Sequence, residues 1–102
     1  YPLRRQRQMC IRDRFAEIME RKLRLNDHRG GWKDCSLLFL LGRLHDEVRE
    51  LNHAIGYGSP EEIGEEAADA ANFAMMIADV VGALGDGSTS SAAKAVEDEE
   101  EM

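Results

Sequence analysis

The 102-residue chain is 43% hydrophobic and 32% charged, which suits a single small globular domain. Its net charge of −7 disfavours a nucleic-acid-binding surface, since phosphate backbones require a basic stripe. With only two cysteines, no secretory signal and no apolar run near the roughly 20 residues that span a bilayer, we expect a cytoplasmic protein without a disulfide framework or membrane contact.

The first segment, residues 1–14, contains five Arg and one Asp and has no clear apolar period. Its end, QMCIRDR, resembles translated adapter sequence, so we treat residues 1–14 as a foreign or disordered segment and assign it no function. The alternative is a genuine basic N-terminal arm. The remaining residues carry 8 basic and 19 acidic side chains, and such a body would repel a polyphosphate unless divalent cations intervened.

The expected fold is all-α, with a domain over residues 15–84. A first helix is predicted from about Asp13 to Leu25, followed by a break around Gly30 and Gly31. A second helix is predicted to start near Asp34 or Ser36, both of which are competent N-caps. Its apolar residues recur at steps of three and four and predict a packing seam of Leu37, Leu41, Leu44, Val48, Leu51 and Ile55.

A third helix is predicted to begin at Ser59-Pro60-Glu61-Glu62, because Ser is a good N-cap and Pro suits the first helical position. Its second half is apolar on nearly all sides, and a helix of that kind is normally buried on all sides. We therefore expect an antiparallel hairpin plus an N-terminal helix, forming four-helix bundles in a homo-oligomer, either dimer or tetramer. The acidic residues 85–102 are predicted to be a disordered tail.

Two acidic pairs carry the expected chemistry. Glu47 and Glu50 share one face of the second helix, and Glu66 and Asp69 repeat the spacing on the third. Glu50 and Glu66 each lie eight residues from the turn near Gly58, so the pairs should face each other. Converging carboxylates repel, and a hard cation such as Mg²⁺ relieves that repulsion and can hold a triphosphate. An isolated pair of this kind is usually only a solvated helix face.

These motifs resemble a known superfamily. Glu47-Val-Arg-Glu50, fifteen intervening residues and Glu66-Ala-Ala-Asp69 are similar to the E-x-x-E…E-x-x-D signature of the all-α nucleotide pyrophosphatases. That group includes MazG-like proteins, dimeric dUTPases, dCTP pyrophosphatases and phosphoribosyl-ATP pyrophosphohydrolases. The likeness is greatest to short bacterial and phage MazG-like proteins and covers about residues 15 to 82, including Lys22-Leu23, Asn26, residues 28–32 and residues 66–77.

The resemblance implies hydrolysis of a nucleoside triphosphate to a monophosphate and pyrophosphate, with Mg²⁺, or alternatively Mn²⁺, on the four carboxylates. It also implies deoxynucleoside or non-standard nucleoside triphosphates as substrates, without indicating the base. Glu47 or Glu50 is expected to orient the attacking water. The alternative function is that of a protein without enzymatic activity, namely a helical module that oligomerises or binds a partner through its third helix.

Five further residues are candidate substrate-binding groups. The basic residues best placed to contact the phosphates of a substrate are Lys22, Arg29 and Lys33. The alternative for each is an ordinary surface charge. Trp32 can stack on a base or pack the loop onto the bundle. Asn72 continues the Glu66–Asp69 face, where it can bind a phosphate or a metal-bound water, or fill a contact between helices.

Overall fold

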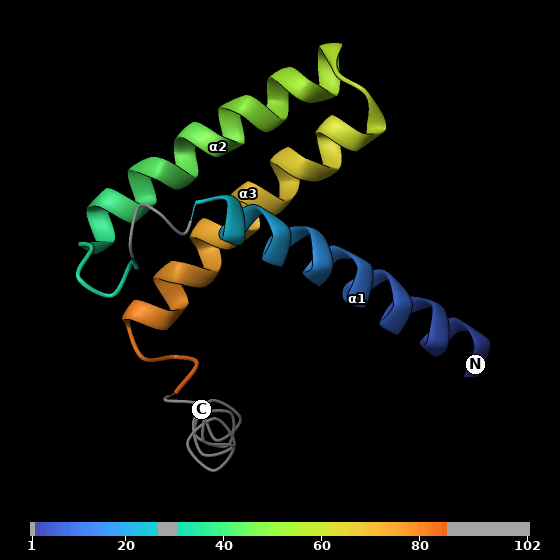
Figure 1. The fold of residues 1–102 in the computed structure, drawn as a ribbon, viewed down its shortest axis with the longest axis horizontal. Coiled ribbons are helices and arrows are strands. Elements are labelled where there is room, and N and C mark those ends of the chain that lie inside the picture. The colour runs from blue at the N-terminus through green and yellow to red at the C-terminus, as the bar shows by residue number, and fades with distance from the viewer. Residues whose placement is uncertain (1, 27–30, 86–102) are drawn as a thin grey trace, which may run out of the picture.

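The computed structural model describes residues 2–26 and 31–85, which form three helices and no strand in those ranges. They are α1 (Pro2–Leu25), α2 (Leu37–Tyr57) and α3 (Pro60–Val80). Helices α2 and α3 form a hairpin, and α1 packs against α3 only, so α3 is the central helix (Figure 1). The prediction of an all-α fold is confirmed. The expected tail from residue 86 onward lies outside the described residues.

Both predicted helix starts are confirmed by their caps. The Ser36 hydroxyl accepts a 3.1 Å hydrogen bond from the backbone N–H of Phe39, and α2 follows at once. The Ser59 hydroxyl accepts from the backbone N–H of Glu62 at 3.2 Å, with Pro60 at the first helical position. Each cap satisfies a backbone donor that the first helical turn leaves without a partner.

Between α2 and α3 the chain turns tightly at Gly58, whose backbone N–H donates to the Ala54 carbonyl at 2.7 Å. A Cβ at this position would lie only 2.9 Å from that carbonyl oxygen and 3.1 Å from a Glu62 carboxylate oxygen. Lack of space for a Cβ therefore favours glycine here. Backbone conformation does not, because the φ of −100° at Gly58 is accessible to any residue. The close turn brings the acidic residues of the two helices together.

Helix α1 corrects one sequence-based boundary. It begins at Pro2 rather than near Asp13, and it extends well beyond the part that meets α3 (Figure 1). Pro suits the first helical position, and the Arg, Gln and Met residues that follow are good helix formers, so a helix forms without an apolar stripe. The side chains of residues 5–14 are all exposed. Whether residues 1–14 are foreign stays a prediction.

The predicted apolar seam of α2 is only partly the packed face. Leu40, Glu47 and Ala54 are the buried residues of the helix, whereas four members of the predicted seam are exposed: Leu37, Leu41, Val48 and Ile55. Helix α2 packs against α3 alone, so one narrow strip is covered and the adjacent apolar strip is not.

The apolar second half of α3, which the sequence predicts to be buried on all sides, is half-buried in the single chain. Its half-buried side chains include Phe73, Met76, Ile77 and Val80. Only three apolar side chains of the described residues are buried, namely Leu40, Ala54 and Ala68. None of the helices in the described ranges is long and apolar enough to cross a membrane.

Candidate metal centre

Three carboxylates from two helices meet in the middle of the hairpin. Glu47 comes from α2, and Glu66 and Asp69 come from successive turns of α3. One oxygen from each lies within 4.8 Å of the other two. The expectation that the two acidic pairs face each other therefore holds for these three residues, and their spacing is suited to a shared cation.

Burial makes this cluster costly without a cation or a proton. Glu47 is only 5% exposed, and its Oε2 has no hydrogen-bond partner among the described residues. The Oε2 of Glu66 is also buried and lacks a partner within the same part of the chain. A buried charged oxygen without a partner is strongly destabilising, so the site favours ligation or protonation.

The pKa values of the three carboxyl groups respond to this environment. Burial, followed by the interaction with Glu50 and the charge of Asp69, raises the pKa of Glu47 from 4.5 to about 7, against the lowering effect of Arg43. Burial and Glu50 also raise the pKa of Glu66. Burial raises the pKa of Asp69, although Lys22 opposes the shift.

Glu50 occupies a different position from the other three predicted ligands. It is exposed and is not part of the group whose oxygens lie within 4.8 Å of one another. Its carboxyl group nevertheless interacts with both Glu47 and Glu66. The structure therefore assembles three of the four expected ligands and leaves Glu50 at the rim of the cluster.

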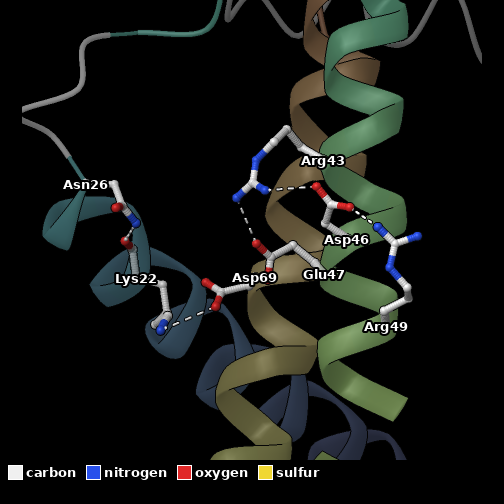
Figure 2. Close-up of polar contacts among 7 residues, drawn as sticks. All are labelled: Lys22, Asn26, Arg43, Asp46, Glu47, Arg49 and Asp69. Atoms are coloured by element: carbon white, nitrogen blue, oxygen red, sulfur yellow. Dashed lines mark hydrogen bonds and ion pairs between the residues drawn. The ribbon is translucent and has the colours of Figure 1, made fainter. Parts of the chain in front are cut away.

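Two basic side chains from different helices neutralise part of the cluster. The Lys22 ammonium from α1 lies 3.3 Å from Asp69, and the Arg43 guanidinium from α2 lies 3.1 Å from Glu47 (Figure 2). Arg43 also contacts Asp46 at 3.1 Å, and Asp46 pairs in turn with Arg49. Neither Asp46 nor Arg43 was among the candidate residues predicted from the sequence, although Arg43 precedes Glu47 by four residues, the spacing of a helical ion pair.

A pocket of about 430 Å³ opens beside the carboxylates. Its polar lining includes Lys22, Arg43, Glu47, Asp69 and Asn72. Its apolar lining includes the aromatic residues Trp32, Phe39 and Phe73. A lining that combines charged groups with aromatic rings suits a ligand that joins an anionic part to a flat ring.

Asn72 is almost fully buried and joins two helices. Its Nδ2 donates a 3.0 Å hydrogen bond to the backbone carbonyl of Met19, linking α3 to α1. Its Oδ1 is buried and has no partner among the described residues. The interhelical contact is therefore present, while the expected contact with a substrate stays a prediction.

The remaining candidates divide between the pocket and its surroundings. The Trp32 indole N–H donates a 2.9 Å hydrogen bond to the Asp79 carboxylate, so the tryptophan both packs the loop onto α3 and lines the pocket. Lys33 is exposed and does not line that pocket. Arg29 lies outside the described residues. Asp79 was missed because nothing in the sequence connects it with a residue 47 positions earlier.

No protein-family model, curated protein or solved structure matches the chain.

Proposed function

We propose that the protein hydrolyses nucleoside triphosphates to monophosphates and pyrophosphate in the presence of Mg²⁺, with Mn²⁺ as a possible substitute. The observation that carries this proposal is the cluster of Glu47, Glu66 and Asp69, with two buried carboxylate oxygens that lack partners among the described residues. The resemblance of its acidic motifs to those of MazG-like proteins agrees with the same activity, and membership of that superfamily is part of the proposal.

The charges around the cluster fit a divalent cation. When ionised, five carboxylates (Glu47, Glu50, Glu66, Asp69 and Asp46) face three cationic side chains (Lys22, Arg43 and Arg49). The formal imbalance is two negative charges, which one divalent ion would neutralise. Carboxylate oxygens are also the ligands that Mg²⁺ and Mn²⁺ accept most readily.

Each part of the site then has a role in the proposed reaction. Glu47, Glu66 and Asp69 hold the metal, with Glu50 at the rim as a further ligand. Bound Mg²⁺ would offset the charge of the phosphate oxygens and favour attack by water on the α-phosphorus. Glu47 and Glu50, which lie one helical turn apart, are the groups that can orient this water and accept its proton.

The neighbouring pocket is the proposed nucleotide site. Lys22 would contact phosphate oxygens, while the Trp32 ring would stack on the base. Asn72 lies one turn beyond Asp69 and lines the same pocket, so it would contact the substrate between the phosphates and the base. Arg29 and Lys33 stay candidates for additional phosphate contacts.

Pyrophosphate release from a panel of deoxynucleoside and non-standard nucleoside triphosphates tests the proposal. We expect release with Mg²⁺, none after addition of a chelator, and none from Asp69→Asn, which removes a charged ligand without opening a cavity. Glu17→Gln is a matched control, because it makes the same acid-to-amide change at an exposed carboxylate that is not part of the cluster. Absence of pyrophosphate release with every nucleotide and both metals would refute the proposed activity.

The exposed apolar strip of α2 supports a second proposal, namely association into a homo-oligomer. Leu37, Leu41, Val48 and Ile55 form this strip, and soluble monomers seldom leave a contiguous apolar helix face in water. Pairing two hairpins through it would give a four-helix bundle. If the nucleotide panel shows no turnover, an oligomerisation or partner-binding module becomes the favoured function.

A further inference from the structure

Arg43 lies at the boundary between two pockets on either side of the carboxylate cluster. One is the pocket of about 430 Å³ that contains Trp32, Glu47 and Asp69. The other, of about 560 Å³, is lined by Glu50, Glu66 and His53. Arg43 lines both, and in Figure 2 its guanidinium extends from α2 above Glu47 and Asp69.

The guanidinium is held in place but is not saturated. Its Nη1 donates to Asp46 and its Nη2 to Glu47, each at 3.1 Å. Its Cζ lies 5.2 Å from the centre of the Phe73 ring, close enough for a cation–π contact. An arginine has five N–H donors, so three are left over once its bonds within the described residues are counted, and the side chain is 37% exposed.

This arrangement resembles a preorganised anion clamp. A planar guanidinium fixed by two carboxylates and an aromatic face loses little entropy when it donates to a further oxygen. Lys22 offers a second cation in the lining of the same pocket, but its flexible ammonium is a point charge without the same directional donors. Arg43 is therefore the residue best built to recognise a phosphate beside the carboxylates.

We propose that Arg43 binds a phosphate group of the ligand, donating its free N–H groups to oxygens of a polyphosphate whose other side faces the metal-binding carboxylates. The inference deepens the proposed function and rests on it for the metal. It assigns Arg43 a direct ligand contact in addition to its ion pair with Glu47.

If the proposal holds, removal of Arg43 should lower the affinity for a polyphosphate and raise the affinity for a metal ion. Without Arg43, a polyphosphate loses charge-assisted hydrogen bonds, which are typically worth enough for a 10- to 100-fold loss of affinity. A metal ion, however, gains, because Arg43 no longer competes for the Glu47 carboxylate. A purely structural role would weaken both affinities together.

The experiment measures both on the full-length chain. Calorimetry gives the affinity for inorganic pyrophosphate with Mg²⁺ present, and the electron paramagnetic resonance signal of free Mn²⁺ gives the metal affinity. For Arg43→Gln we expect pyrophosphate affinity to fall at least about tenfold while Mn²⁺ affinity rises. Arg43→Lys, which keeps the charge and loses the planar fork, should fall between wild type and Arg43→Gln for pyrophosphate.

Arg24→Gln is the matched control, because it removes the same charge from a side chain that is 74% exposed and lines neither pocket. We expect it to change neither affinity. Unchanged pyrophosphate affinity in Arg43→Gln, or a joint loss of both affinities, would overturn the Arg43 assignment while leaving the hydrolysis proposal intact. If Arg43→Gln does not fold, wild-type affinity in Arg43→Lys would overturn the assignment. Failure of the wild type to bind pyrophosphate with Mg²⁺ would overturn the Arg43 assignment, whereas the hydrolysis proposal is tested separately by pyrophosphate release from the nucleotide panel.

Discussion

The indole N–H of Trp32 and the carboxylate of Asp79 meet at 2.9 Å although 47 residues separate them along the chain. This hydrogen bond attaches the loop before α2 to the last turn of α3. Trp32 also lines the pocket beside the carboxylates, so Asp79 sets the position of one pocket wall.

Asp79→Ala should release Trp32 from α3. We expect a red-shifted tryptophan emission, stronger quenching by acrylamide and a loss of roughly 1–3 kcal/mol in the free energy of unfolding, as for other hydrogen bonds to charged groups. The reading is unambiguous because Trp32 is the sole tryptophan. Asp79→Asn, which keeps an acceptor oxygen, should change the emission less; equal spectra for Asp79→Ala and wild type would contradict the role assigned to this contact.

Glu66→Gln should stabilise the metal-free protein and abolish its response to metal. The substitution removes one of the mutually repelling carboxylates, whose pKa is raised by burial and by Glu50, so we expect the free energy of unfolding to increase. Thermal melts with and without Mg²⁺ measure both effects. Glu61→Gln, an exposed change on the same helix, serves as control and should keep the increase in Tm that Mg²⁺ produces.

The stability of the metal-free protein should fall between pH 5 and pH 8 because of Glu47. Its pKa is raised to about 7 in the fold from 4.5, so over this interval the folded state retains a proton that the unfolded chain has lost. The folded state thus binds more protons, and the free energy of unfolding decreases as pH rises until Glu47 ionises.

Melting temperatures of wild type and Glu47→Gln across this pH range measure the effect. The wild type should lose stability relative to the variant as pH rises, because glutamine does not titrate. Saturating Mg²⁺ should reduce the loss, since a cation stabilises the ionised carboxylate. A constant difference between the two proteins from pH 5 to pH 8 would show that Glu47 does not have the raised pKa.

Val48→Glu should disrupt self-association if the exposed strip of α2 forms an interface. Val48 is about half exposed in the single chain, so the change costs little within the protomer but would bury a charge between two copies. Light scattering after size-exclusion chromatography should show a lower mass than for wild type. Asn52→Glu adds the same charge to an exposed polar position on α2 and should leave the mass unchanged. A wild-type monomer would rule out this interface.

Truncation to begin at Phe15 should leave activity and thermal stability nearly unchanged. The side chains of residues 5–14 are exposed, and exposed ion pairs contribute only about 0–1 kcal/mol each. Truncation to begin at Leu25 is the contrasting variant, because it also removes Lys22 and the Met19 carbonyl that binds Asn72. Loss of hydrolysis on the shorter truncation would identify the basic segment as a working phosphate-binding arm.

The sequence by itself determined the features that depend on neighbouring residues. The caps at Ser36 and Ser59 and the turn at Gly58 are local, and the structure has them where the sequence predicts. The shared face of Glu66 and Asp69 follows from helical geometry alone. Helix propensity is a local property as well, and α1 begins at Pro2 although residues 2–14 have no apolar stripe.

The tertiary structure alone decided which of these residues act together. The way α2 packs on α3 buries Glu47 and leaves Glu50 exposed, although both lie on the same predicted face. It also leaves Val48 in solvent, although the apolar period includes that residue. The contacts of Lys22 with Asp69 and of Trp32 with Asp79 join segments that no local pattern connects. Periodicity gives the direction of a side chain around its own helix, whereas burial and partnership depend on how that helix is rotated against its neighbour.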